Sequence, residues 1–315
     1  MANNSQIGSS SYDPLGRSRT EIGLEVALSI LICLISILDN LLVVYVVNND
    51  SKLKSVTSTF IHNLALTDIS MASLHMPFWI ISLCKGTWIF SEKWCEISAT
   101  ILFTCGLASI LTMGLIAVNR YIRVVKPALY NRPVFPSKRI ARVYCALVWI
   151  ASMLLATPPL YGFGKMAYNP LFAICSFAWK AEHILYIILV VGVVINGTTV
   201  LIFYCYYKIY KTLKESTQNL NAHSIEDGAV LSESPRTDIK LLKTSFTIVC
   251  IFLMIWGPVT VVVIVESAGI FIPREISMPV IYLVFIGSLV NPIIYGIIGR
   301  SEFQAAFKRA LRFSR

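Results

Sequence analysis

The sequence has few charged residues. Only 14% of its 315 residues are Asp, Glu, Lys or Arg, whereas an average soluble domain has roughly 25%. Hydrophobic residues make up 56% of the chain, and its mean hydropathy is +0.69. These values exclude a soluble globular domain, and they exclude a disordered chain because so apolar a sequence has too much surface to bury. The composition therefore predicts a membrane protein with several spans.

Apolar runs long enough to cross a bilayer recur along the chain. A helix needs about 20 apolar residues to cross the hydrocarbon core, whereas the strands of a barrel would show alternating segments of about 10 residues. The runs here are apolar nearly throughout, so we predict an all-α fold, a bundle of seven transmembrane helices over residues 23–298. The runs lie near residues 23–47, 57–83, 97–125, 140–162, 184–207, 244–265 and 276–298.

Three polar segments complete the predicted organisation. Residues 1–22 form an N-terminal tail without the apolar run of a signal peptide. Residues 211–238 are rich in Ser, Asn, Glu and Thr, which predicts a mobile third cytoplasmic loop. Residues 299–315 place Phe303 and Phe307 one helical turn apart among basic residues, which predicts an amphipathic helix held at the membrane lipids, followed by a short tail.

The basic residues indicate the orientation of the bundle. The loops on one side hold seven of the 27 Lys and Arg residues and the other side holds 20. Since cytoplasmic loops carry the excess of basic residues, the N-terminus is predicted to be extracellular, with the chain crossing the plasma membrane several times. The net charge of +10 then reflects topology, and we expect no nucleic-acid partner. Asn3 begins an Asn-Asn-Ser acceptor for glycosylation in the outer tail.

Three cysteines fall near the outer face, and two of them are in positions suited to a disulfide, which leaves Cys84 over. Cys95 begins the third span, and Cys175 lies in the loop before the fifth. Both face the oxidising compartment in the predicted topology, so they are candidates for a bridge. Such a bridge would hold the outer loop over the mouth of the bundle.

Asp68 lies in the middle of the second span, where an ionisable residue needs a partner or a function. Asn40, Ser109 and Asn291 are expected at a similar depth, and their oxygens could hold an allosteric sodium ion together with the carboxylate. The alternative is a protonated Asp68 in an ordinary hydrogen-bonded cluster. Asp39 is a second acid at this depth, and the sequence indicates no partner for it.

Arg120 ends the third span in Asn119-Arg120-Tyr121, and Asp238 precedes the sixth span at the same membrane level. A pair between these two side chains would join helices that can separate, and would act as a conformational switch. The alternative is an arginine that extends into the lipid headgroups beside an unrelated aspartate. Pro258 and Pro292 each remove a helix hydrogen bond within a span and favour kinks there.

Taken in order across the seven spans, these motifs resemble the rhodopsin-like family of G-protein-coupled receptors, and the resemblance runs from the first span to the amphipathic helix. The family implies an outer ligand cavity, no enzyme activity, and a cytoplasmic groove for a heterotrimeric G protein, with arrestin as a further partner. The matching residues are Asn40, Leu64 to Asp68, Trp88, Cys95 with Cys175, Asn119-Arg120-Tyr121, Trp149, Phe252 with Trp256 and Pro258, and Asn291-Pro292-Ile293-Ile294-Tyr295.

Several positions depart from the family pattern. Asn119 replaces the usual Asp before the arginine, which removes one restraint on Arg120. Thr198 stands where the fifth span usually has proline, which puts the inward bulge of that helix in doubt. Gly287 replaces a frequent asparagine near Asp68 and weakens the sodium hypothesis.

The resemblance also restricts the ligand. Opsins carry a lysine for retinal at the position of Phe285, and aminergic receptors carry an aspartate at the position of Leu102. Neither retinal nor a ligand held as in aminergic receptors is therefore expected. The chain is moderately similar to melatonin receptors, but Pro159 and Trp179 stand at the positions of their ligand-binding asparagine and glutamine. Melatonin itself is not expected.

The predicted cavity is apolar and aromatic, which suits a neutral or lipid-like small molecule. None of the residues expected to line it is charged, and the nearby His75, His183, Glu266 and Arg274 are candidates for contact with a polar end of the ligand. The alternative for any one of these aromatics is helix packing. The candidate ligand-binding residues are Trp79, Leu102, Phe103, Gly106, Phe177, Trp179, Tyr186, Trp256, Tyr282 and Phe285.

A receptor is favoured over a transporter or channel with seven spans, because the spans show no repeat. In the predicted mechanism, an agonist favours a state in which the sixth span pivots near Pro258 and the cytoplasmic groove opens. The residues assigned to this switch and to coupling are Asn119, Arg120, Tyr121, Tyr206, Asp238, Phe252, Pro258, Asn291, Pro292 and Tyr295.

Overall fold

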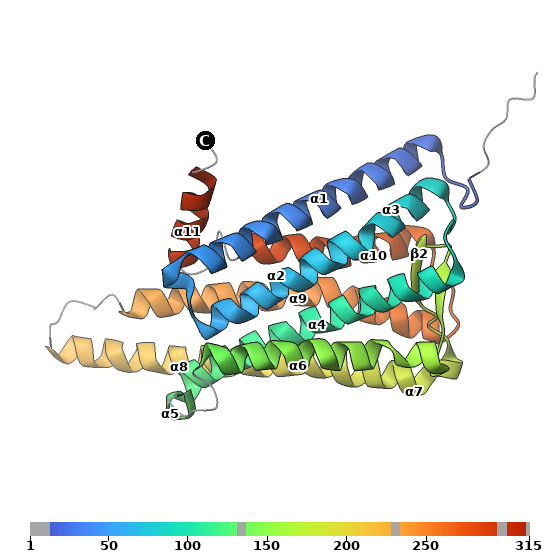
Figure 1. The fold of residues 1–315 in the computed structure, drawn as a ribbon. Coiled ribbons are helices and arrows are strands. Elements are labelled where there is room, and N and C mark those ends of the chain that lie inside the picture. The colour runs from blue at the N-terminus through green and yellow to red at the C-terminus, as the bar shows by residue number, and fades with distance from the viewer. Residues whose placement is uncertain (1–12, 131–136, 228–233, 295–300, 313–315) are drawn as a thin grey trace, which may run out of the picture.

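The computed structural model of the chain describes residues 13–130, 137–227, 234–294 and 301–312. Its long helices lie side by side, with a two-stranded sheet at one end and α11 at the other (Figure 1). In chain order the elements are α1 (Arg19–Asn49), η1 (Ser51–Leu53), α2 (Val56–Leu74), α3 (Met76–Lys85), α4 (Glu92–Val125), α5 (Pro127–Tyr130), α6 (Lys138–Ala156), η2 (Pro158–Tyr161), β1 (Met166–Asn169), β2 (Ile174–Phe177), η3 (Ala181–His183), α7 (Ile184–Ile187), η4 (Ile188–Asn196), α8 (Gly197–Asp227), α9 (Ser234–Ser267), α10 (Arg274–Ile293) and α11 (Ser301–Arg312).

The predicted all-α bundle of seven spans is confirmed. Within the described residues, six helical segments are long and apolar enough to cross a membrane, and the apolar part of α9, Leu253–Ser267, supplies a shorter seventh. Serine side chains start several of these helices by accepting a hydrogen bond from a backbone N–H in the first turn. Ser18 does so in a full capping box with Glu21, and Ser91 caps α4 in the same position.

The second span is divided in two. Helix α2 ends at Leu74, and α3 starts again at Met76 with Pro77 in its first turn. Proline has no backbone N–H and disfavours the helical conformation in the residue before it, so the helix is interrupted at this point.

Helix α4 lies in the centre of the bundle and contacts α2, α6 and α8. Asn63 of α2 donates a hydrogen bond to Thr112 of α4 at 2.8 Å, and accepts one from the indole of Trp149 of α6 at 3.0 Å. Gly114 lets α8 approach closely, because a Cβ at this position would lie 2.9 Å from Thr198 Cγ2. Polar side chains and small residues thus hold helices together where lipid gives no hydrophobic driving force.

The fifth span contains the bulge that its lack of proline put in doubt. Residues Ile188–Asn196 form a π-helix, η4, ahead of α8. The side-chain amide of Asn196 donates to the carbonyl of Val191, five residues earlier, at 2.8 Å. This contact satisfies a carbonyl group within the widened turns, so Asn196 stabilises the bulge although Thr198 is not a proline.

Two segments that were predicted to be cytoplasmic differ in structure from the prediction. Most of residues 211–238, expected to be a loop, is helical, because α8 continues to Asp227 and α9 begins at Ser234. Helix α11 forms as expected, but it packs against α1 and η1. Phe303 is buried in a cluster with residues of α1 and α2, and Arg309 pairs with Asp50. One face of the helix is therefore held by protein contacts.

Candidate functional site

An internal cavity of about 170 Å³ lies between the helices on the outer side of the bundle. Its wall is formed by α2, α4, η4, α9, α10 and the β-hairpin, and most of the side chains on it are apolar. The polar residues on the wall are Asp68, Ser109, Ser176, Thr260, Glu266, Ser277, Ser288 and Asn291. A mostly apolar cavity with a few polar groups is typical of small-molecule sites.

The hairpin β1–β2 covers the outer end of this cavity. Its strands pair antiparallel with Tyr168 opposite Cys175, and Cys175 forms the predicted disulfide with Cys95 at the start of α4. The residues at the tip of the hairpin enter the bundle, where Phe172 is buried and its carbonyl accepts a hydrogen bond from the Trp79 indole at 3.1 Å. Ile174 and Phe172 therefore form part of the cavity wall.

A group of four charged residues lies beside the hairpin at the outer end of the bundle. This outer ion-pair cluster consists of Asp13, Arg17, Glu25 and Arg274. The Arg17 guanidinium donates to Asp13 at 3.0 Å and to Glu25 at 2.6 Å. The Arg274 guanidinium donates to both oxygens of Glu25, at 2.6 and 2.7 Å. The cluster joins the segment before α1 to α10.

Backbone contacts extend the cluster to two more segments. Arg17 donates to the carbonyl of Leu83 at the end of α3, at 2.7 Å, and Arg274 donates to the carbonyl of Leu171 in the hairpin. The hydrogen bonds that Arg17 makes with the Asp13 side chain hold the pKa of this carboxyl below its usual range. Sequence reasoning placed Arg274 near the cavity but missed Arg17, because nothing local in the sequence indicates its distant partners.

Six of the ten residues predicted to bind ligand lie on the cavity wall. They are Leu102, Phe103, Gly106, Trp179, Trp256 and Phe285. Phe285 is almost fully buried and packs on Trp79, with ring centroids 4.5 Å apart. Phe285 is the residue at the position where the family resemblance implies a lysine in opsins.

The other four are directed to neighbouring protein groups and are not among the described wall residues. Trp79 bonds the hairpin, as noted above, and Phe177 packs on Tyr186 with ring centroids 4.8 Å apart. The Tyr186 hydroxyl donates to the carbonyl of Leu155 at 2.7 Å. The Tyr282 hydroxyl donates to the Glu25 carbonyl at 3.0 Å. In this structure the four shape and support the wall from behind.

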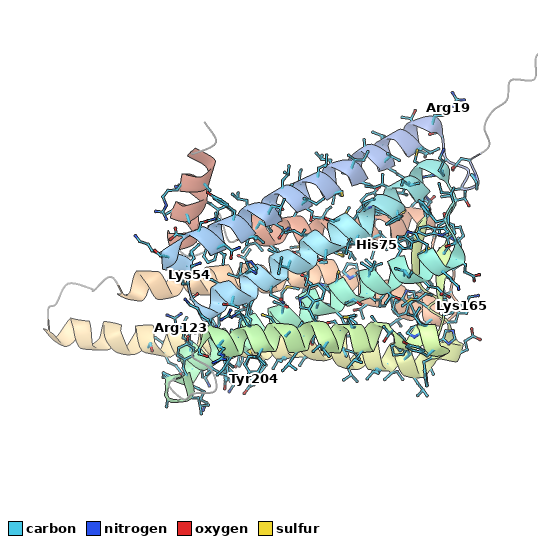
Figure 2. The ribbon with its side chains drawn as sticks, viewed as in Figure 1. Arg19, Lys54, His75, Arg123, Lys165 and Tyr204 are labelled. Carbon is cyan, nitrogen blue, oxygen red and sulfur yellow. A yellow bond between two sulfur atoms is a disulfide. The ribbon has the colours of Figure 1, made fainter. Side chains whose placement is uncertain are left out.

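The expectation of a wall without charged residues is wrong, because Asp68 and Glu266 lie on it. Glu266, near the end of α9, accepts a hydrogen bond from the Asn169 amide at 3.2 Å. His75 is buried and lies behind the wall, where its Nδ1 contacts Ser98 (Figure 2). His183 packs against the ring of Phe177.

Asp68 lies at the inner part of the cavity and is 1% exposed. Asn291 of α10 donates to one of its carboxylate oxygens at 3.0 Å, and Ser109 lies on the same wall. Asn40 is directed elsewhere, since its amide donates to the carbonyl of Ser288 at 3.0 Å and contacts Asp39 at 3.2 Å. The structure thus brings together the Asp68, Ser109 and Asn291 proposed for sodium.

Four of the predicted switch residues, Asn119, Arg120, Tyr121 and Tyr206, lie near the C-terminal end of α4 and in the neighbouring part of α8. Asn119 is buried and donates to the hydroxyl of Thr57 at 3.0 Å. Arg120 lies within hydrogen-bonding reach of the Tyr206 hydroxyl, and the ring of Tyr121 faces that of Tyr204 with centroids 6.0 Å apart.

Some of the predicted site residues lie outside the part of the chain that the structure describes. Asn3 and Tyr295 fall outside the described residues, and so do the side chains of Asp238 and Phe252. Pro258 and Pro292 lie within α9 and α10 as expected.

Comparison with known proteins identifies this arrangement. A family model described as "7 transmembrane receptor (rhodopsin family)" matches residues 39–295. The Gq-coupled rhodopsin of Mizuhopecten yessoensis is 23% identical over 291 residues, which are 88% of this chain but only 57% of that protein. The rat melatonin receptor type 1B is 26% identical over 277 residues, or 86% of this chain and 73% of the receptor.

The fold also matches a solved structure. The crystal structure of squid rhodopsin superposes with a TM-score of 0.77 at 24% sequence identity, covering 93% of this chain and 87% of the other.

Proposed function

The chain belongs to the rhodopsin family of seven-transmembrane receptors, and we propose that it binds a small ligand in the outer cavity and activates a heterotrimeric G protein. It is a multi-pass membrane protein, and we propose that it lies in the plasma membrane with its N-terminus outside. The observation that carries the proposal is the cavity between α4, η4, α9 and α10 beneath a disulfide-anchored hairpin. The family is one of receptors, not enzymes.

The largely apolar wall supports a ligand with an apolar body. Phe103, Trp179, Trp256 and Phe285 present aromatic surface to the cavity, and burial of apolar ligand surface is worth roughly 25 cal/mol per Å² before the costs of binding. Trp256 lies on α9, two residues before Pro258. A ligand that pressed on Trp256 would therefore act close to the kink about which α9 is proposed to move.

At the cytoplasmic end, outward movement of α9 would open a groove for the C-terminal helix of the G-protein α subunit. Arg120, which lies beside Tyr206, would face this groove. In the inactive state we propose that Asp238 restrains Arg120, so the switch is an ion pair between α4 and α9. Arrestin is expected to use the same face.

The experiment is to measure G-protein activation in cells that express the wild type, Arg120→Ala and Asp238→Ala at equal surface density. Asp238→Ala is expected to raise ligand-independent signalling because it removes the restraint, whereas Arg120→Ala is expected to impair coupling. Unchanged basal activity in Asp238→Ala would count against the ion pair. Arg142→Ala is the matched control, since Arg142 is an exposed residue of α6, which is not one of the helices of the proposed switch.

A sodium ion at Asp68 is a further part of the proposal. The Asp68 carboxylate and the Ser109 hydroxyl lie on one wall and offer the oxygen ligands that a hard monovalent cation prefers. The Asn291 amide, which donates an N–H to Asp68 in this structure, would turn its oxygen toward the ion. When bound, the ion would neutralise the buried carboxylate. Sodium chloride is then expected to raise the unfolding temperature of the wild type more than choline chloride does, and Asp68→Asn should abolish the difference. An equal response of wild type and variant would rule out this site.

A further inference from the structure

Glu266 is the charged residue at the outer part of the cavity wall. It lies in the last turn of α9 and is half-buried. The one hydrogen-bond partner of its side chain in the described part of the chain is the neutral amide of Asn169, so no cation there balances the charge of the ionised carboxylate. A half-buried carboxylate against an apolar wall is costly unless it is paired, so the cavity favours an occupant that supplies a positive charge.

The two cations of the outer ion-pair cluster are already paired. Arg17 and Arg274 both bind Glu25, and Arg17 also binds Asp13. The outer ion-pair cluster therefore holds two positive and two negative side chains and is neutral by itself. It has no cation left over for Glu266.

The position of Glu266 on α9 also limits the shape of the occupant. Glu266 follows Trp256 by ten residues, which corresponds to about 15 Å along a helix. Both residues lie on the wall. An occupant that contacts both residues is therefore long enough to extend from the outer carboxylate toward the indole.

We propose that the cavity takes a long amine, whose protonated nitrogen pairs with Glu266 and whose apolar body extends toward Trp256. This assignment rests on the proposed function, because it takes the cavity to be the ligand site. It replaces the neutral ligand expected from the sequence with an amphiphile that has an apolar body and one cationic end. The recognition differs from that of aminergic receptors, since Leu102 stands at the position of their aspartate and the acid here is on α9.

The test uses the full-length receptor in nanodiscs and saturable binding of tritiated phenyloctylamine, with binding to empty nanodiscs subtracted. Phenyloctanol, which has the same apolar body without the charge, is measured by competition. We expect the amine to bind the wild type more tightly than the alcohol. Glu266→Gln should weaken amine binding about ten- to a hundredfold, the range of a charged hydrogen bond, and leave the alcohol unchanged.

Glu275→Gln is the matched control, because Glu275 is an exposed acid at the same end of the bundle and is not among the described wall residues. It removes the same charge from the outer surface and should leave both affinities unchanged. Glu266→Lys provides a second variant, which is expected to bind phenyloctanoic acid in place of the amine. The inference is overturned if the amine shows no saturable binding, or if Glu266→Gln and Glu275→Gln bind it equally.

The binding assay contains no G protein, so its result is independent of coupling. Glu266-dependent amine binding without Arg120-dependent signalling would refute the proposed function alone. Arg120-dependent signalling without Glu266-dependent binding would refute the amine alone.

Discussion

Replacement of Arg17 by Gln is expected to release the segment before α1 from the outer end of the bundle. The Arg17 side chain is only 4% exposed, and its guanidinium donates to Asp13, to Glu25 and to the Leu83 carbonyl. A glutamine is shorter and neutral, and its amide can replace at most two of these contacts. The change leaves Asp13, whose side chain is 6% exposed, without its cation.

The size of the effect follows from these contacts. Removal of one partner of a buried ion pair costs about 3–5 kcal/mol. The lower end of that range applies, because Glu25 keeps Arg274 and the cluster lies at the edge of the bundle. About 3 kcal/mol corresponds to an increase of roughly a hundredfold in the population of the open form.

Hydrogen–deuterium exchange of the backbone amides of Gly16 and Arg17 measures this opening directly. Both amides donate to Asp13, at 2.9 Å in each case, so they exchange only when the segment opens. Arg19→Gln is the matched control, since Arg19 is the first residue of α1 and its exposed side chain is directed away from the bundle (Figure 2). If Arg17→Gln exchanged no faster than Arg19→Gln, the cluster would not hold the segment.

Three further predictions concern other parts of the molecule. Gly114→Ala is expected to lower the free energy of unfolding by about 1–3 kcal/mol through overpacking. Adding Thr198→Ser, which removes the facing methyl group, should restore the unfolding temperature. An unchanged unfolding temperature in Gly114→Ala would contradict the close approach of the two helices. Because Arg17 lowers the pKa of Asp13, the stabilisation by this pair is present at neutral pH and lost as the pH falls through the lowered pKa, below about 4. The difference in unfolding temperature between wild type and Arg17→Gln should therefore shrink on acidification. A difference that stayed constant with pH would contradict this role of the pair. Incubation with cis-retinal and borohydride should give no adduct on the cavity wall by mass spectrometry, because the wall residue Phe285 stands at the position of the opsin lysine. A trapped adduct on a wall residue would contradict this prediction and show that another group forms the Schiff base.

Much of the fold follows from the length of the apolar runs. A run of about 20 apolar residues has few stable conformations in lipid other than a helix, so the seven spans are predictable. The helices α8 and α9 continue well beyond their apolar runs, which hydropathy does not indicate. The missing proline at Thr198, taken alone, argues against a bulge in the fifth span, but it does not decide whether the bulge forms. The structure places the stabilising contact in the side chain of Asn196, which bonds to the carbonyl of Val191, and a polar residue within an apolar run could have indicated it.

The cavity was predicted less completely than the fold, for a physical reason. The helical period places a residue on a face, but the rotamer and the nearest polar partner decide whether its side chain reaches the cavity. Tyr186 and Tyr282 lie on suitable helices, yet their hydroxyl groups are drawn to the carbonyls of Leu155 and Glu25. Glu266 reaches the wall because it lies in the last turn of α9, where the hairpin residue Asn169 can contact it.

The central claim is that this receptor activates a heterotrimeric G protein through Arg120. The most direct measurement is nucleotide exchange by purified heterotrimers of each α-subunit class, with the receptor in nanodiscs and shown to unfold cooperatively. We predict that the wild type accelerates exchange on at least one class, that Arg120→Ala does not, and that Arg142→Ala behaves as the wild type. The claim would be contradicted if the folded wild type accelerated exchange on no class of α subunit, or if Arg120→Ala accelerated it as much as the wild type.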